Sequence, residues 1–357
     1  AHFFELGGDS IVALQVVSRA RQQGLQLAPR DLFQFPRLSE LAGVARAPQA
    51  QAEQAPASGE LPLLPIQAHF FALDQAEPAH WNQALQLELL RELDPELLEQ
   101  ALQALVRHHD ALRLRFHRQQ GAWQQRYAEL EPEQALLWQR EAADEAEALA
   151  LCEAAQRSLN LAEGPMLRAV HLRQADRPTR LLLVIHHLVV DGLSWRILLE
   201  DLLSAYRQVQ AWQPVRLPAR SASYRAWAEQ LQAWTRGPEA DTALDAWCSR
   251  LAGAPAPLPR ELAGEQACYA ERRSLSLSLD AASTRRLLQA PARLGVRIDA
   301  LLLGALTRSL CRWSGQSQLR VNLEGHGRED LFEDVAAPAS VLDTGRLAPD
   351  EMDLFDD

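Results

Sequence analysis

The sequence contains no lysine, and its 36 basic residues, all arginine, are outnumbered by 47 acidic residues, which gives a net charge of -11. Because binding to phosphate backbones draws on clustered basic charge, this balance argues against a nucleic-acid partner. The cysteines are few and scattered, without CxxC spacing, which argues against a secreted disulfide scaffold. No run approaches the roughly 20 apolar residues that span a bilayer, and no signal segment opens the chain. We therefore expect a cytoplasmic protein with no membrane partner.

A linker separates two regions of different character. Residues 47–60, APQAQAEQAPASGE, are rich in Ala, Gln and Pro and show no periodicity, which is typical of a flexible connection. Before it, residues 1–46 are predicted to form a small helical unit, in which Ile11, Leu14 and Val17 recur at helical spacing. We therefore place a domain boundary in this linker.

From Leu61 onward the pattern mixes strands and helices, which predicts an α/β or α+β fold with mixed sheets. One helix opens with Asp94 as its cap and Pro95 at its first position. Strands are predicted at 84–90, 111–116, 181–187, 272–279 and 318–324, and helices at 142–158, 194–211, 223–235, 240–252, 281–290 and 297–313. A break at GAPAPLPRELAG divides the region into two lobes, 61–252 and from 265 onward.

Ser10 stands at the start of a helix, after two glycines, in LGGDSI. The glycines allow a tight turn, and the helix dipole favours a phosphate ester at this hydroxyl, although a plain N-cap serine is the alternative. LGGDSI and the helix after it resemble the peptidyl carrier proteins of nonribosomal peptide synthetases. The resemblance implies that residues 1–46 are the C-terminal part of a carrier, with 4'-phosphopantetheine attached covalently to Ser10. Asp9 resembles the carriers that precede epimerization domains.

A second motif, LLLVIHHLVVDGLSW, ends a predicted strand with His186 and His187, ahead of the turn at Asp191. An imidazole can accept or donate a proton near neutral pH. Because alternate side chains of a strand face opposite ways, only one of the two histidines can point into a pocket. A satisfied pair of core histidines is one alternative, and a metal site is weaker because a third ligand is missing. Asp191 is predicted either to orient the ring or to hold the turn.

The sequence HHLVVDG closely resembles the HHxxxDG signature of the condensation-domain superfamily, in its epimerization branch. The resemblance implies that His187 is the catalytic histidine and that no metal takes part. It also implies structural support from His186, Asp191, Gly192 and Arg113, with Arg113 paired to Asp191 and Arg115 as the second candidate for that pair. The similar triplet His108-His109-Asp110 is interpreted as the polar end of a helix.

Three further segments fit the same branch. LPLLPIQAHFF at 61–71 resembles its opening motif, although the family has Trp where Ala68 or His69 stands. DALLLGAL at 299–306 resembles a core helix, and EGHGRED at 324–330 resembles the epimerization signature that true condensation domains lack. The implied fold is two-lobed and similar to chloramphenicol acetyltransferase.

Inverting a stereocentre beside a thioester carbonyl requires a proton to leave one face of the α-carbon and another to arrive on the opposite face. Two titratable groups must flank the carbon, and a carboxyl group whose pKa is raised by burial can be one of them. The resemblance assigns these roles to His187 and Glu324, without fixing which group removes the proton. An ordinary carboxylate at a strand end is the alternative for Glu324.

The last residues depart from the family pattern. We expect residues 265–335 to begin the second lobe and residues 336–357 to form an aberrant acidic tail, so that the lobe is incomplete, its apolar surface exposed and its activity impaired. The function expected is epimerization of an L-aminoacyl or peptidyl thioester on a phosphopantetheinyl carrier. The alternatives are a condensation domain that forms peptide bonds and an inactive carrier or docking fragment. Expected partners are the tethered substrate, an upstream adenylation domain and a downstream condensation domain.

Overall fold

The computed structural model describes most of the chain in two compact units, one up to Ala240 and one from Asp241 to Leu323. The described residues are 3, 12–13, 16–17, 19–20, 24–25, 27, 29–46, 55–130, 135–175, 177–192, 194–218, 220, 224–253, 257–259, 273–294, 296 and 298–323. Ser10 and Glu324 lie outside them. Within this described part, no helix has the length and hydropathy needed to cross a membrane.

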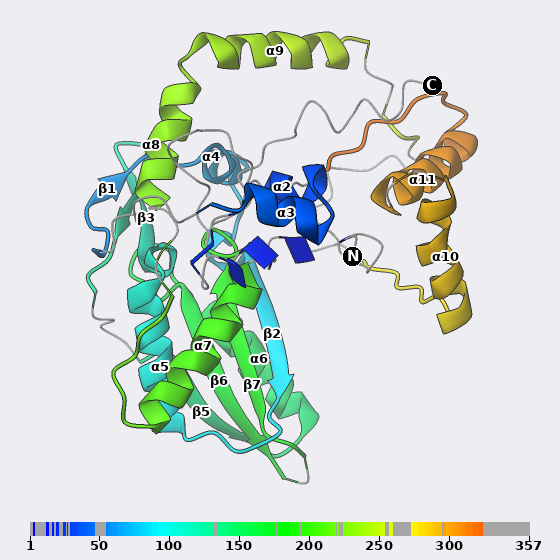
Figure 1. The fold of residues 1–357 in the computed structure, drawn as a ribbon. Helices are drawn as coiled ribbons and strands as arrows, with labels where there is room; N and C mark the ends of the chain where they lie inside the picture. Colours follow the sequence, from blue (N-terminus) through cyan, green and yellow to red (C-terminus); the bar gives the residue numbers. More distant parts are fainter. Residues whose placement is uncertain are drawn as a thin grey trace. The chain divides into compact units, whose positions relative to one another are not determined.

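A four-stranded mixed sheet forms the centre of the first unit, with strand order β2-β7-β6-β5. β7 (Arg180–His186) pairs antiparallel with both β2 (Asn82–Glu88) and β6 (Leu167–Gln174), and β6 pairs parallel with β5 (Leu137–Ala142) (Figure 1). All seven residues of β7 are buried, as expected of a central strand covered on both faces.

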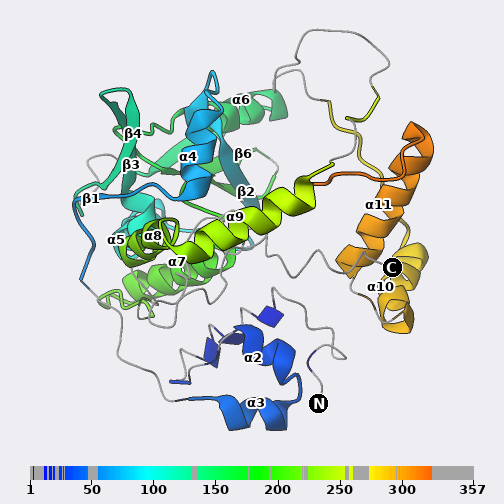
Figure 2. The same cartoon turned by 90° about the horizontal axis from the view of Figure 1, so that it is seen from above.

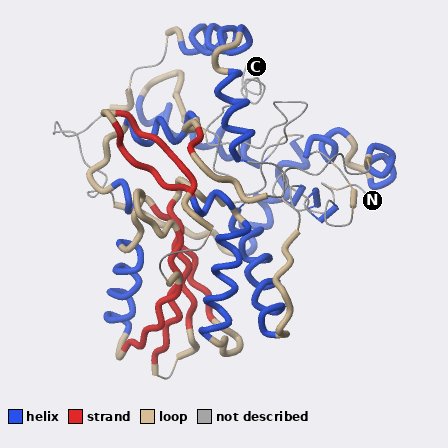
Figure 3. The backbone as a smooth tube through the Cα atoms, turned by 90° about the vertical axis from the view of Figure 1, so that its left-hand side faces the viewer, coloured by secondary structure: helices blue, strands red, loops and turns tan. Residues whose placement is uncertain are grey.

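Helices cover the two faces of this sheet (Figure 3). α5 (Pro95–His108) and α7 (Ser194–Gln210) pack with Leu181, Leu183 and Ile185 in the larger apolar cluster. α6 (Glu145–Arg157) packs against the opposite face, where the alternate β7 residues Leu182 and Val184 point. The period-two alternation of β7 thus supplies apolar side chains to two separate layers.

The start of α5 agrees with its sequence signals. The Asp94 carboxylate accepts hydrogen bonds from the backbone N–H groups of Glu96 and Leu97 at 2.8 and 3.3 Å, and Pro95 takes the first helical position. The apolar stripe, Leu98, Ala101, Leu102, Leu105 and Val106, is buried.

A smaller antiparallel sheet has the order β1-β4-β3. It consists of β1 (Glu60–Leu61), β4 (Ala122–Tyr127) and β3 (Leu114–Gln119), which Figure 2 shows gathered beside one another. The strand predicted at 111–116 therefore begins later, because a 3-10 turn, η2 (Asp110–Arg113), precedes β3.

Further helices lie outside the two sheets among the residues described up to Leu251. They are α2 (Pro29–Gln34), α3 (Leu38–Val44), α4 (Pro65–Ala72), η1 (Pro78–His80), α8 (Tyr224–Trp234) and α9 (Pro238–Leu251). Near the N-terminus, Ala13, Val17, Leu27 and Leu32 form a small buried cluster of their own. The helical character predicted for this region is therefore confirmed among its described residues.

Among the described residues of the second unit, which also takes in most of α9, α10 (Ala281–Leu294) and α11 (Ile298–Ser314) lie close to their predicted positions. The two strands predicted beside them are wrong, because residues 273–280 and 318–323 have no regular structure. In the first of these segments Leu275 and Leu277 are 88 and 89% exposed. Alternating leucines favour a strand only when another strand pairs with them and a core covers one face, and these side chains lie in solvent.

Candidate active site

His186 is the last residue of β7, and its ring is sealed inside the first unit. The Nε2 atom lies 2.8 Å from the carbonyl oxygen of Pro78, and Nδ1 accepts a hydrogen bond from the Leu188 N–H at 3.0 Å. Burial lowers the pKa of His186 to about 4, with a smaller lowering effect from His187. His186 is therefore a neutral, fully hydrogen-bonded core histidine that holds the strand end to η1.

His187, the next residue, lies outside the strand and is half-buried. Its backbone N–H donates to the Trp81 carbonyl at 2.8 Å, and its Nδ1 atom lies 3.0 Å from the carbonyl oxygen of Val190. A carbonyl only accepts, so the proton of the neutral ring is on Nδ1 and the Nε2 lone pair faces away from the turn. The two histidines differ as the strand geometry predicts: one is sealed and one presents a basic nitrogen.

Two residues that the sequence pattern did not single out stand against this nitrogen. Gln83 of β2 places its side-chain nitrogen 3.1 Å from His187 Nε2. The side-chain oxygen of Gln83 accepts a hydrogen bond from the indole N–H of Trp195, at 2.7 Å. Gln83 lies opposite Ile185 in the β2-β7 pair, so only the sheet register brings it beside His187. No motif in the sequence signals this contact.

Asp191 shapes the start of α7. Its buried carboxylate accepts hydrogen bonds from the backbone N–H and the hydroxyl of Ser194, at 2.6 and 2.7 Å, and its carbonyl accepts from Trp195 N–H at 3.3 Å. Asp191 thus caps the helix that carries Trp195. A Cβ built at Gly192 would meet nothing within 4 Å, so the fold itself does not require glycine there.

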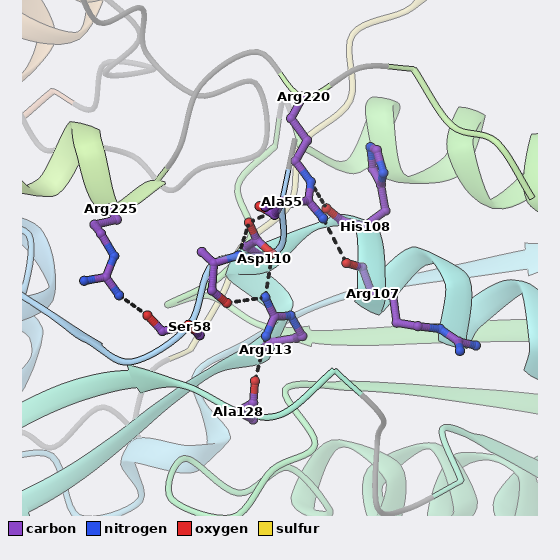
Figure 4. A network of polar contacts seen from close by, with 10 residues as sticks. Ala55, Ser58, Arg107, His108, Asp110, Arg113, Ala128, Arg220 and Arg225 are labelled. Atoms are coloured by element: carbon purple, nitrogen blue, oxygen red, sulfur yellow. Dashed lines mark hydrogen bonds and ion pairs between the residues drawn. The ribbon is translucent and has the colours of Figure 1, made fainter. Parts of the chain in front are cut away.

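The ion pair predicted between Arg113 and Asp191 is wrong. The guanidinium of Arg113 instead donates to the Asp110 carboxylate at 2.6 Å and to the carbonyl oxygens of Ala57 and Ala128 at 2.7 and 2.6 Å (Figure 4). The reason is local, because η2 places residues three apart on one side of a single turn. The second candidate, Arg115, donates to the carbonyl oxygen of Leu114 at 2.9 Å.

His108 is the last residue of α5 and His109 its C-cap, so the triplet begins at the polar end of a helix, as the sequence indicated, and Asp110 opens η2. His109 Nε2 lies 2.8 Å from the Asp201 carboxylate of α7, and burial, followed by the neighbouring His109, lowers the pKa of His108 to about 4. The ligand atoms of His108, His109 and Asp201 lie within 4.8 Å of one another, which is a spacing that could hold a metal ion. The hydrogen bond between His109 and Asp201 already gives these two groups partners, and the nearby Arg220 guanidinium disfavours a further cation.

Two protein-family models match the chain. Residues 57–337 match the condensation domain family, and residues 1–45 match the phosphopantetheine attachment site, which indicates covalently bound 4'-phosphopantetheine as the cofactor of this part. A linear gramicidin synthase polypeptide of Brevibacillus parabrevis is 44% identical over 94% of this chain, and a surfactin synthase polypeptide of Bacillus subtilis is 37% identical, also over 94%. The chain spans only 7 and 10% of the length of these two relatives.

Solved structures of the same family have a similar fold. The epimerization domain from the third module of tyrocidine synthetase B superposes with a TM-score of 0.76 at 34% identity, covering 83% of this chain and 67% of that one. The first condensation domain of the calcium-dependent antibiotic synthetase shares the fold, with a TM-score of 0.64 at 20% identity over 80% of this chain and 66% of its own. The expected fold, mixed α/β and similar to chloramphenicol acetyltransferase, is confirmed. The chain belongs to the condensation-domain family of nonribosomal peptide synthetases.

Proposed function

We propose that the chain is an epimerase that inverts the α-carbon of an L-aminoacyl or peptidyl thioester held on a phosphopantetheinyl carrier. The observation that carries the proposal is the state of His187: a half-buried ring whose Nδ1–H is committed to the Val190 carbonyl and whose Nε2 is the proton acceptor, in contact with the Gln83 amide. Similarity to an epimerization domain at 34% identity, together with EGHGRED at 324–330, supports this branch over its relatives.

The proposed reaction needs two proton-transferring groups on opposite faces of the α-carbon. His187 Nε2 is one, and Glu324, outside the described residues, is the other. One group takes the α-proton, the electron pair moves onto the thioester carbonyl, and the other group returns a proton to the opposite face. The thioester assists because sulfur donates less to the carbonyl than nitrogen does, which leaves the α-hydrogen more acidic.

The other site residues have supporting roles in this proposal. His186 fixes the end of β7, and Asp191 caps the helix that begins beside the site. Gly192 leaves open space next to the turn, where a pantetheine arm could pass. Ser10 is the proposed point of attachment of that arm. The proposed partners are an upstream adenylation domain, which loads the amino acid, and a downstream condensation domain, which uses the product.

The second candidate is peptide-bond formation, in which the same nitrogen would assist attack by an amine. The shared fold of the condensation domain of the calcium-dependent antibiotic synthetase favours keeping this alternative. Chiral chromatography separates the two functions. The chain is incubated with an L-aminoacyl-pantetheine thioester, with and without an amine acceptor.

The epimerase proposal predicts D-product in both incubations, and His187→Ala should lower its rate by about 100-fold or more. His69→Ala, a change at an exposed histidine on α4, should leave the rate unchanged. Amide product with acceptor and no D-product without it would replace the proposal with condensation. Equal rates for His187→Ala and the unaltered chain would favour an inactive carrier or docking fragment.

A further inference from the structure

The lone pair on His187 Nε2 faces a side chain rather than open solvent. The Gln83 amide lies against it, with the two nitrogen atoms 3.1 Å apart, and the Trp195 indole lies behind the amide. The three residues come from separate elements and form one chain of contacts. Gln83 lies on β2, His187 in the turn after β7, and Trp195 on α7.

The direction of every hydrogen bond in this chain follows from chemistry. An indole N–H can only donate, so the Gln83 oxygen must face Trp195 and the Gln83 NH2 group must face His187. The Val190 carbonyl can only accept, so Nδ1 of His187 carries a proton and Nε2 is the acceptor. The Trp195 N–H at one end can only donate and the Val190 carbonyl at the other end can only accept. The hydrogen bonds between them therefore have one possible direction, with the proton of the neutral His187 ring on Nδ1.

Burial makes this arrangement rigid. The Trp195 ring is only 7% exposed, and the first turn of its helix is capped by the Asp191 carboxylate through Ser194. Gln83 is half-buried and lies in a fully paired part of the β2-β7 ladder. Little rotamer freedom remains for the amide, so the orientation that Trp195 imposes is passed on to the imidazole.

We infer that Gln83, oriented by Trp195, is a positioning residue for His187: with the Val190 carbonyl it fixes the ring plane, and its N–H group covers the reactive nitrogen until substrate arrives. The inference rests on the proposed function and adds a step to it. An amide N–H and a newly formed imidazolium N–H cannot share a hydrogen bond. Proton transfer to Nε2 therefore requires the Gln83 amide to turn away, against the hold of Trp195, as the α-carbon takes its place.

The first test needs no turnover. Ring-nitrogen chemical shifts of His187, measured by NMR on the full chain with isotope-labelled histidine, report the tautomer, and His187→Ala assigns the signals. The unaltered chain should show the Nδ1–H tautomer with a hydrogen-bonded Nε2, and Gln83→Leu should move the Nε2 shift toward that of a nitrogen without a donor, because only the amide contact is lost. Gln86→Leu, on an exposed residue of the same strand, is the matched control and should change nothing. Trp195→Phe, which keeps a buried ring but removes the N–H, should reproduce part of the effect and serves if Gln83→Leu fails to fold.

The second test uses turnover. Gln83→Leu should lower kcat about tenfold with KM within about twofold, because the ring is misplaced while substrate contacts remain. In the Trp195→Phe background the same change should cost clearly less, since both residues act through one contact chain. Gln83→Glu should move the acid limb of the pH–rate profile to higher pH by about one unit, because a carboxylate beside the ring stabilises the imidazolium.

The two tests separate the inference from the function it rests on. Ring shifts that respond to Gln83→Leu in a chain without epimerase activity would sustain the positioning role and defeat the proposed function. Ring shifts identical in Gln83→Leu and Gln86→Leu would overturn the positioning role, whatever the activity.

Discussion

The Arg113 side chain joins three segments of the first unit, and its removal should be costly. The guanidinium is 2% exposed and donates to the Asp110 carboxylate and to the carbonyl oxygens of Ala57 and Ala128. In Arg113→Met the side-chain volume is largely kept, but the Asp110 carboxylate, 12% exposed, loses its closest cation and two carbonyl oxygens lose a donor.

The magnitude follows from these contacts. Removing one partner of a buried ion pair costs about 3–5 kcal/mol. The Arg220 guanidinium, 3.4 Å from the other oxygen of Asp110, still compensates part of the charge, as Figure 4 shows. We therefore expect the lower end of the range, about 3 kcal/mol, which raises the opening equilibrium constant of this unit roughly 100-fold.

Native-state hydrogen exchange of the β3 and β4 amides measures this free energy for the first unit alone. Arg118→Met is the control, because Arg118 is exposed on β3, the strand that follows η2, and it should change stability by less than about 0.5 kcal/mol. A double-mutant cycle with Asp110→Asn should give a coupling above about 1.5 kcal/mol, and a cycle with Asp191→Asn a coupling near zero. Strong coupling to Asp191, or a loss below about 1 kcal/mol for Arg113→Met, would refute the reasoning.

Three further predictions concern the site. Burial lowers the pKa of His186 from 6.5 to about 4, so protons bind the unfolded chain first, and the contribution of His186 to stability is complete above pH 6.5 and falls by about 3 kcal/mol toward pH 4. Urea unfolding across this range should show a loss smaller by about 3 kcal/mol in His186→Asn, and an unchanged loss would contradict the assignment. Asp191→Ala should destabilise the chain by about 1–2 kcal/mol in denaturant titrations, because the helix cap is lost. Asp191→Asn keeps an acceptor for Ser194 and should cost less than half of that. Equal costs for the two variants would show that the charge matters more than the cap. Gly192→Ala should leave the free energy of unfolding within about 0.5 kcal/mol, since a Cβ there meets nothing within 4 Å, and a larger change would mean that the turn needs glycine.

Local signals predicted the elements whose cause is local. The capping aspartate and the proline at the start of α5 stand where the pattern placed them, and the apolar run of β7 is indeed a buried strand. The Leu-Ser alternation at 272–279 failed because a strand also needs a partner, which periodicity alone cannot supply. Strands β4, β5 and β6 were missed because arginine and glutamine interrupt their apolar pattern.

In the site, too, features with a local cause were predicted and features that depend on distant residues were not. Strand alternation correctly predicted that His186 and His187 face different ways, and His186 is the buried one, while the choice of His187 as the catalytic residue came from the family resemblance and stays a prediction. The contact of Gln83 with His187 spans 104 residues and depends on sheet register, so no spacing rule could find it. The partner of Arg113 was misassigned because the choice between two acidic residues depends on a 3-10 turn that the pattern presented as strand. Ser10 and Glu324 remain predictions.

Deuterium incorporation tests the central claim most directly. The full chain is incubated in deuterium oxide with an L-aminoacyl-pantetheine thioester and no amine acceptor, and label at the α-carbon is measured by mass spectrometry. The account predicts label that grows with time in the unaltered chain and falls to the uncatalysed level in His187→Ala. No label above that level in the unaltered chain, or equal label in both chains, would contradict proton transfer by His187.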